Sequence, residues 1–305
     1  MKRFSLLLFG FISCLQLILA QNITVATYNV RYDNEEDARR GDGWKNRCPV
    51  QVKMILFNDI DILGTQEVLN NQLLDLQKGL PEYEYIGVGR DDGKTKGEYA
   101  PIFYKKSKFR LLDSGHFWLS EHEGYPNKGW DAVLPRICTW GKFEVKESGK
   151  ELWFFNLHMD HVGTEARSQS AKLVLKKIKE MCNNAPVILT GDFNVDQTSE
   201  SYRLLAESGV LFDSYNVTKL RYATNGTFNA WSTSNFTESR IDHIFVSKNL
   251  TVERYGILTD TYRSAGENSK ETHEGDFPVD LKVKNYIARL PSDHFMVKTG
   301  IFLKK

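Results

Sequence analysis

The sequence has few cysteines and little excess charge of either sign. Its 305 residues include 4 cysteines, and the formal net charge at pH 7 is +1. So few and so widely spaced cysteines do not indicate a disulfide framework, and we expect Cys48, Cys138 and Cys182 to be mostly buried thiols. A nearly neutral chain is not expected to bind nucleic acid through its overall charge, because that attraction needs several cations facing the phosphates.

Linkers, repeats and several well-known catalytic motifs are also absent from the sequence. It has no Pro-rich or Gly/Ser-rich tract, no low-complexity block and no repeat with a period of 20–50 residues. A P-loop, a GxSxG elbow, a Rossmann glycine pattern and the HExxH and CxxC zinc spacings are missing too. Although the chain exceeds the usual domain size of ~100–200 residues, we predict one domain over residues 21–305.

The N-terminus reads as a secretory signal peptide. Two basic residues precede an apolar run that ends near Ala20, which predicts a signal peptide over residues 1–20 and a secreted or periplasmic mature chain. An uncleaved membrane anchor is an alternative, although Gln16 interrupts the apolar run. A lipoprotein anchored at Cys14 is another, but Phe11 and the apolar residues after Cys14 argue against it.

Strand-like and helix-like segments are mixed along the chain without strict alternation. The expected strands are rich in β-branched and aromatic residues, and the expected helices show a 3.6-residue apolar period. This mixture predicts an α/β sandwich, in which two sheets pack face to face and helices cover their outer faces. Strands are expected at 23–30, 61–68, 83–89, 100–106, 136–145, 152–159, 186–193, 240–247, 252–258 and 294–303, and helices at 45–57, 70–78, 164–182 and 199–207.

Two other segments have less regular patterns. Four lysines on the expected helix at 164–182 are most simply a solvated helix face. Residues 259–291 form a long polar excursion before the last strand, and long loops in compact domains are usually functional or mobile. We therefore expect residues 259–291 to lie near the functional site.

Polar residues that suit catalysis or metal binding stand at the ends of several expected strands. Any one of them alone is more often a turn residue or a helix cap, but chance explains the whole set poorly. Because rigid strands would aim these side chains, we expect them to meet at one site, with His161 and His243 structural or peripheral. The set is Asn29, Glu67, Asn156, His158, Asp160, Asp192, Asn194, Asp242, Asp293 and His294.

The oxygen-rich part of this set suits a hard cation. Glu67, Asp293 and Asn29 offer ligands of the kind that Mg²⁺ prefers, with Mn²⁺ or Ca²⁺ as alternatives. Zinc would favour nitrogen and sulfur ligands. A divalent ion, two histidines and a carboxylate together suit the attack of water on phosphorus.

The motifs GDFN at 191–194, RIDHI at 240–244 and SDH at 292–294, together with YNV around Asn29, resemble those of the endonuclease/exonuclease/phosphatase superfamily. This superfamily includes deoxyribonucleases, inositol polyphosphate phosphatases, sphingomyelinases and deadenylases. The resemblance covers nearly all of the chain after residue 20. It implies a four-layer α/β sandwich of two mixed β-sheets flanked by helices, with the site at one end of the sheets.

The resemblance also implies roles for the metal-binding side of the site. Glu67 would be the principal metal ligand, with Asn29 and Asp293 beside it. Asp192 would orient or deprotonate the attacking water, and Asn194 would hold a phosphoryl oxygen.

On the other side of the site the resemblance implies a histidine pair. His294, oriented by Asp242, would stabilise the transition state, and His158 would contact the scissile phosphate. Glu98 would orient His158, unless it is simply solvated. Arg167 would touch phosphate or lie on the helix surface, with the two readings equally favoured.

One position departs from the pattern of the superfamily. Some of its nucleases carry an acid two residues after the first asparagine, where this chain has Arg31. Either metal affinity is weaker here, or the substrate brings more negative charge to that side.

The function expected from these observations is a secreted, Mg²⁺-dependent phosphodiesterase or phosphatase that acts as a monomer without an obligate protein partner. Nucleic acid, a phospholipid headgroup and a phosphosugar all stay open as substrates. Specific alternatives are a metal-dependent endonuclease and, from another class, a non-catalytic binding protein. Some aromatic residues are placed to stack on bases or sugars, although core or rim packing is favoured for them: Trp44, Tyr99, Trp118, Trp130 and Trp231.

Overall fold

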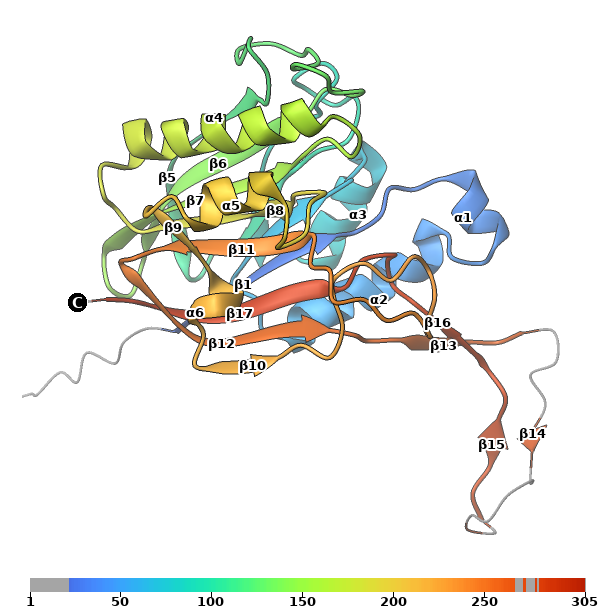
Figure 1. Ribbon diagram of the computed structural model, residues 1–305. Helices are drawn as coiled ribbons and strands as arrows, with labels where there is room; N and C mark the ends of the chain where they lie inside the picture. The colour runs from blue at the N-terminus through green and yellow to red at the C-terminus, as the bar shows by residue number, and fades with distance from the viewer. Residues whose placement is uncertain (1–21, 267–270, 273–277, 279, 305) are drawn as a thin grey trace, which may run out of the picture.

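Two β-sheets lie at the centre of the computed structural model, which describes residues 22–266, 271–272, 278 and 280–304 (Figure 1). In spatial order, the first sheet consists of β10 (Leu220–Tyr222), β12 (Leu250–Leu258), β17 (Met296–Leu303), β1 (Asn22–Asn29), β2 (Ile62–Gln66), β4 (Ile102–Lys105) and β3 (Tyr83–Ile86). The second consists of β5 (Phe109–Trp118), β6 (Ile137–Val145), β7 (Lys150–His158), β8 (Val187–Asp192), β11 (Asp242–Ser247) and β9 (Leu211–Asp213). Both are mixed: β1 pairs parallel with β2 but antiparallel with β17, and β8 pairs parallel with β7 but antiparallel with β11.

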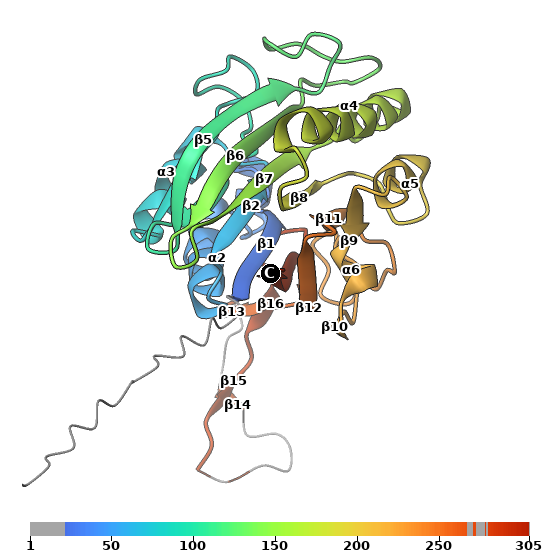
Figure 2. The same cartoon turned by 90° about the vertical axis from the view of Figure 1, so that its left-hand side faces the viewer.

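Helices cover the outer faces of both sheets. Helices α2 (Trp44–Phe57) and α3 (Asn70–Gly79) lie on the first sheet, and α4 (Thr164–Cys182) and α5 (Glu200–Ala206) lie on the second, as Figure 2 shows. Two short helices, α1 (Glu35–Arg39) and α6 (Ser214–Val217), complete the helical elements of the described residues. The predicted four-layer α/β sandwich is therefore confirmed.

The largest apolar cluster lies between the two sheets. Val25 and Ile62 from one sheet and Phe154, Ile188 and Ile244 from the other are all fully buried there. These strands are apolar on both faces because each sheet is also covered by helices, which explains why their sequences read as continuous apolar runs. On α4, the buried stripe is Ala171, Val174, Leu175 and Ile178. Three of the four lysines, Lys172, Lys176 and Lys179, are exposed as predicted, whereas Lys177 is half-buried and pairs with Glu123.

All the strands and helices expected from the sequence are present, with ends that differ by up to three residues. Strand β5 was missed. It is an edge strand with exposed residues along its middle, and a bulge between Leu111 and Asp113 breaks its alternation. Cys48, Cys138 and Cys182 are free thiols, and the last two are buried, as expected.

The excursion at 259–291 is more structured than a single loop. Strands β13 (Tyr262–Ser264) and β16 (Ile287–Arg289) pair with each other, and so do β14 (Glu271–Thr272) and β15 (Val283–Lys284). The β14–β15 ribbon points away from the sandwich (Figures 1 and 2). The expectation that this excursion enters the site region is therefore wrong for β14 and β15.

The predicted signal peptide at 1–20 lies outside the described residues. None of the helices in the described part of the chain is long and apolar enough to cross a membrane.

A buried polar network joins the two sheets just below the strand ends. Asn156 Nδ2 donates to Thr65 O at 2.8 Å and to Pro101 O at 3.0 Å. Asn156 Oδ1 accepts from Gln66 Nε2 at 2.7 Å and from Thr190 Oγ1 at 3.0 Å. Because every hydrogen-bonding atom of this amide has a partner, the network is a stable structural element. Asn156 belongs to this network and not to the group of converging site residues.

We expect Gly64→Ala to destabilise the protein, because the space beside Gly64 is filled by this network. A Cβ atom at residue 64 would overlap Thr190 Oγ1 and Asn156 Oδ1. Overpacking of this kind typically costs ~1–3 kcal/mol, and urea unfolding would measure the loss. Gly124→Ala is the matched control, since nothing lies within 4 Å of the added Cβ. Equal unfolding free energies for the two variants would contradict the prediction.

Candidate active site

The strand registers bring candidate residues from both sheets to one end of the sandwich. Asp192, the last residue of β8, pairs with His158 on β7 and with Asp242 on β11. In the facing sheet, Asn29 at the end of β1 lies beside the end of β2, which Glu67 follows directly. These sequence-distant residues therefore meet as predicted.

Asn29 connects the two sheets at this point. Its Nδ2 atom donates to Glu67 Oε1 at 3.0 Å and to Asp192 Oδ2 at 2.9 Å. Its Oδ1 atom accepts from the backbone N–H of Arg31 at 3.0 Å. In this orientation Asn29 aligns two carboxylates and turns its own oxygen away from them, so a direct bond from Asn29 to a metal stays a prediction.

Glu67 and Asn194 both have a left-handed backbone, with φ of 61° and 51°. For residues other than glycine this costs on the order of 1–3 kcal/mol and persists where the surroundings enforce it, often at functional sites. Glu67 Oε2 accepts from Tyr32 N at 3.1 Å, and Asn194 N donates to Asp192 Oδ1 at 2.9 Å. The strained turns thus hold the carboxylates of Glu67 and Asp192 in fixed positions.

His294 and Asp242 form a buried hydrogen-bonded pair. Nδ1 of His294 lies 2.9 Å from Asp242 Oδ2, and its Nε2 lies 3.8 Å from Asp192 Oδ2. Burial by itself would lower the pKa of His294, but the carboxylates of Asp242 and Asp192 raise the pKa well above its usual value. The imidazole is therefore a cation held against Asp192.

His158 is in the opposite protonation state. Burial, followed by the charge of Arg136, lowers the pKa of His158 to about 3. Its Nε2 contacts Asn194 Nδ2 at 3.1 Å and lies 3.6 Å from Asp192 Oδ2. Two histidines with pKa values pushed apart on either side of one carboxylate are typical of a site that separates acid and base roles.

Glu98 and Arg167 have well-defined contacts. Glu98 forms a bidentate pair with Arg90 at 2.7 and 2.8 Å, and its Oε2 lies 3.6 Å from His158 Nδ1. The pair with Arg90 means that the simple solvated reading does not hold. At 3.6 Å its carboxylate is beyond hydrogen-bond distance of His158 Nδ1, so an orienting role for Glu98 stays a prediction. Arg167 Nη1 donates to Asp160 O at 2.9 Å, a contact that supports the turn before α4.

Asp160 and the two other histidines of the region are structural. Asp160 pairs with Arg136 and accepts hydrogen bonds from two backbone N–H groups in the turn before α4. His161 lies against Arg136 at 2.9 Å. His243 is buried and lies 3.1 Å from Val195 O through its Nε2 atom. These three residues make structural contacts beside the strand ends and do not point toward Asp192, Asp242 and His294.

The carboxylates of Glu67 and Asp293 suit a divalent cation. Burial raises the pKa of Asp293, the His294 cation lowers it, and the Glu67 carboxylate raises it again. The charge of Arg31 also lowers the pKa of Asp293. A divalent cation would further relieve the repulsion between the two acids, and their oxygen atoms match hard ions. Glu67 and Asp293 therefore fit the predicted metal role.

Asp192, Asp242 and His294 form a second candidate metal site. Ligand atoms of Asp192, Asp242 and His294 all lie within 4.8 Å of one another. However, His294 Nδ1 and Asp242 Oδ2 are already hydrogen-bonded to each other at 2.9 Å. The carboxylates of Asp242 and Asp192 keep the imidazole of His294 protonated, and an imidazolium has no free lone pair for a metal, so we interpret this group as a base and a charged pair.

Phe228 was not predicted as a site residue, and Ser292 was named only as part of the SDH motif. Phe228 is 40% exposed, and its ring lies 5.1 Å from that of His294, centroid to centroid. Ser292 Oγ donates to Asn29 O at 2.7 Å, which ties the first and last motifs together. Phe228 lies in a segment without apolar periodicity, so no signal marked it.

Of the aromatic residues that were considered for stacking, Trp44, Tyr99 and Trp118 are buried, and Trp130 and Trp231 are half-buried, which favours packing.

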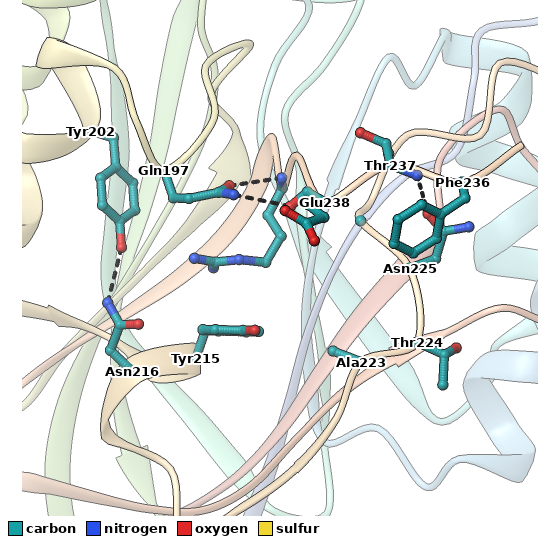
Figure 3. A pocket seen from close by; sticks show the side chains of 12 residues that line it. Gln197, Tyr202, Tyr215, Asn216, Ala223, Thr224, Asn225, Phe236, Thr237 and Glu238 are labelled. Atoms are coloured by element: carbon teal, nitrogen blue, oxygen red, sulfur yellow. Dashed lines mark hydrogen bonds between the residues drawn. The ribbon is translucent and has the colours of Figure 1, made fainter.

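A cavity of about 570 Å³ lies close to this end of the molecule without containing the candidate residues. Tyr202, Tyr215, Asn225, Phe236 and Glu238 are among its lining residues (Figure 3). The segment 223–240 borders the cavity and also carries Phe228 against His294. Because the titratable groups converge elsewhere, the strand ends and not this cavity define the candidate site.

Comparisons with known proteins agree with this geometry. Residues 26–294 match the model of the Endonuclease/Exonuclease/phosphatase family. A solved mannosyl-6-phosphatase from Bacteroides thetaiotaomicron is 54% identical, with a TM-score of 0.85, over 92% of this chain and 100% of that one.

Matches to curated proteins are more partial. An uncharacterized protein of Acanthamoeba polyphaga mimivirus is 30% identical over 50% of this chain and 60% of its own length. Human tyrosyl-DNA phosphodiesterase 2 is 28% identical over 44% of this chain and 33% of its own length. The chain thus spans less than two thirds of the length of these curated relatives.

Proposed function

Since the chain belongs to the endonuclease/exonuclease/phosphatase family, we propose that it is a Mg²⁺-dependent phosphatase that releases phosphate from a phosphosugar such as mannose 6-phosphate. The observation that carries the substrate class is the similarity, at 54% identity over 92% of this chain, to a mannosyl-6-phosphatase. Hydrolysis of phosphoric esters is common to the family, and the converging acids and histidines provide the groups that such a reaction needs.

Glu67 and Asp293 would hold the ion, and the hydrogen bond from Asn29 Nδ2 would keep the Glu67 carboxylate in position. When bound, Mg²⁺ supplies positive charge that polarises the phosphoryl group. Asp192 is the base: Asn29 Nδ2 and Asn194 N fix its two oxygens at 2.9 Å. Burial, followed by the charge of Asp242, raises the pKa of Asp192, which makes this carboxylate a better proton acceptor for the attacking water.

The two histidines act on the phosphoryl group from either side of Asp192. His294, kept positive by Asp242, donates from Nε2 toward charge that develops on the phosphoryl oxygens. His158 is neutral and contacts the same group, and Asn194 Nδ2 orients it through the 3.1 Å contact with Nε2. The ring of Phe228 packs edge-on against the imidazole of His294.

Two alternatives differ in how well they are supported. A phosphodiesterase acting on nucleic acid is supported by the partial similarity to a tyrosyl-DNA phosphodiesterase. A non-catalytic binding protein on the same fold has little support, because both histidines and all four central carboxylates are present and positioned.

A substrate panel separates these functions. We expect release of phosphate from mannose 6-phosphate and p-nitrophenyl phosphate with Mg²⁺, and none with a chelator. Hydrolysis of bis-p-nitrophenyl phosphate should be at least about tenfold slower, since a difference of only ~1.4 kcal/mol in transition-state binding has that effect. A diester or plasmid DNA as the better substrate would favour the phosphodiesterase, and no metal-dependent release from any substrate would favour the binding protein.

The cellular context of the enzyme is a further part of the proposal. The apolar N-terminal run supports cleavage after Ala20 and a secreted or periplasmic enzyme. We propose that residues 21–305 fold as one domain and act as a monomer. N-terminal sequencing of the mature protein and its elution volume in size-exclusion chromatography test these statements.

A further inference from the structure

Arg31 places a fixed positive charge at the edge of the candidate site. Its Nη1 atom lies 3.4 Å from Asp293 Oδ2, and its side chain is 23% exposed. Its guanidinium also stacks on the ring of Tyr32, 4.6 Å from the ring centroid. The mechanism above does not use this cation.

The guanidinium is held rigidly by its neighbours. Nε of Arg31 donates to Asp37 Oδ2 at 2.9 Å, and Asp37 is itself fully buried. Asn34 fixes Asp37 through its own Nδ2 at 2.7 Å and by capping Asp37 N at 2.8 Å. The carbonyl of Arg31 accepts from Gln72 and Arg47, at 2.9 and 3.1 Å. Little conformational entropy is therefore left to lose when a ligand binds this side chain.

Part of the hydrogen-bonding capacity of Arg31 is unused. The 3.4 Å separation from Asp293 is longer than the ~2.7–2.9 Å of a charge-assisted hydrogen bond. Among the described residues, none accepts a hydrogen bond from Nη2 of Arg31. A planar guanidinium with free N–H groups beside a metal-binding carboxylate matches the geometry of a phosphate group.

We propose that Arg31 binds a nonbridging phosphoryl oxygen of the substrate and makes the site prefer phosphate monoesters to diesters. This inference rests on the proposed function, because it places the phosphoryl group between Asp293, Asp192 and His294. A monoester carries a charge of about −1.5 to −2 at pH 7, since its second pKa is ~6, whereas a diester carries one negative charge. Arg31 is the cation that meets the additional charge.

The test compares monoester and diester hydrolysis by Arg31→Gln. We expect kcat/KM for mannose 6-phosphate and p-nitrophenyl phosphate to fall by roughly 10- to 100-fold, the usual effect of losing a charged hydrogen bond. The kcat/KM for bis-p-nitrophenyl phosphate should change by less than about threefold, because the diester lacks the additional charge. The inhibition constant of inorganic phosphate should rise in parallel with the loss on monoesters.

Two further variants separate substrate binding from structural effects. Asp37→Asn weakens the anchor of Arg31, so it should lower monoester hydrolysis selectively but by a smaller factor. Arg39→Gln is the matched control: it removes the same charge from an exposed residue of the neighbouring helix α1, where Arg39 pairs with exposed Glu35. Calorimetric titration with Mg²⁺ should give similar affinities for the wild type, Arg31→Gln and Arg39→Gln.

Each outcome bears on the inference. Equal losses on both ester classes, together with a changed Mg²⁺ affinity, would mean that Arg31 acts only through Asp293, and would overturn the inference while leaving the proposed function intact. Unchanged monoester hydrolysis in Arg31→Gln would also overturn it. A wild-type enzyme that itself prefers diesters would overturn the proposed function, and the inference with it.

Discussion

His294→Ala is expected to lower kcat by about 10²-fold or more, with a much smaller change in KM. The loss of one preorganised group that stabilises developing charge usually has an effect of this size. His294 is buried, and its cation is held 3.8 Å from Asp192 by the hydrogen bond to Asp242. Steady-state kinetics on p-nitrophenyl phosphate at saturating Mg²⁺ measure the effect.

Two companion variants show whether the loss comes from the Asp242–His294 pair. Asp242→Asn should also lower kcat, and the double variant should be only slightly slower than His294→Ala, because residues that act as one unit are not additive. His122→Ala, at an exposed histidine in the loop after β5, should keep wild-type kinetics. A His294→Ala enzyme within about threefold of the wild-type kcat would remove His294 from the catalytic group, since such a loss lies far below that expected for a charge-stabilising group.

Much of the fold was predictable from the sequence because its strands are buried on both faces. Segments such as 152–159 and 186–193 consist of apolar runs that end in polar residues, and both the strand and its end are visible in the pattern. Strand β5 was not predictable, because an edge strand needs little apolar surface and its bulge shifts the register. The β13–β16 pair has the same difficulty: its residues are exposed or half-buried, and no apolar face marks it.

The candidate site was predictable where a residue stands directly at a strand end. His158, Asp192 and Asp242 are register neighbours, so sheet pairing alone brings them together. Phe228 was not, because it reaches the site through a loop whose path depends on tertiary contacts. Asn156 was placed among the strand-end residues by its position in the sequence, but its side chain points between the sheets into the polar network.

The direction of a side chain is a further limit of the sequence pattern. Asn29 was predicted to face the metal, yet its amide nitrogen lies between Glu67 and Asp192 and its oxygen accepts from a backbone N–H. The order of residues along β1 fixes which sheet face a side chain occupies, but not which of its atoms faces a neighbour. That choice follows from the carboxylates supplied by two other strands.

Glu67→Ala is expected to raise the Mg²⁺ concentration needed for half-maximal activity by at least about 10- to 100-fold, the range lost when even an outer partner of a metal site is removed. Glu67 is the acid that two donors, Asn29 Nδ2 and Tyr32 N, hold with its oxygens at the strand ends. Removing it leaves Asp293 as the remaining acid of the predicted ligand pair. Rates measured across a Mg²⁺ series, with calorimetric titration of the ion as a second readout, test the prediction.

The comparison variants for Glu67→Ala distinguish metal binding from loss of the fold. Asp293→Asn should shift the Mg²⁺ dependence in the same direction, and Glu180→Ala, at an exposed acid on α4, should leave it unchanged. High Mg²⁺ should restore part of the rate in Glu67→Ala if the carboxylate only binds the ion, because mass action then offsets the weaker affinity. A Glu67→Ala enzyme with the wild-type Mg²⁺ dependence and calorimetric affinity would remove Glu67 from the ligand set.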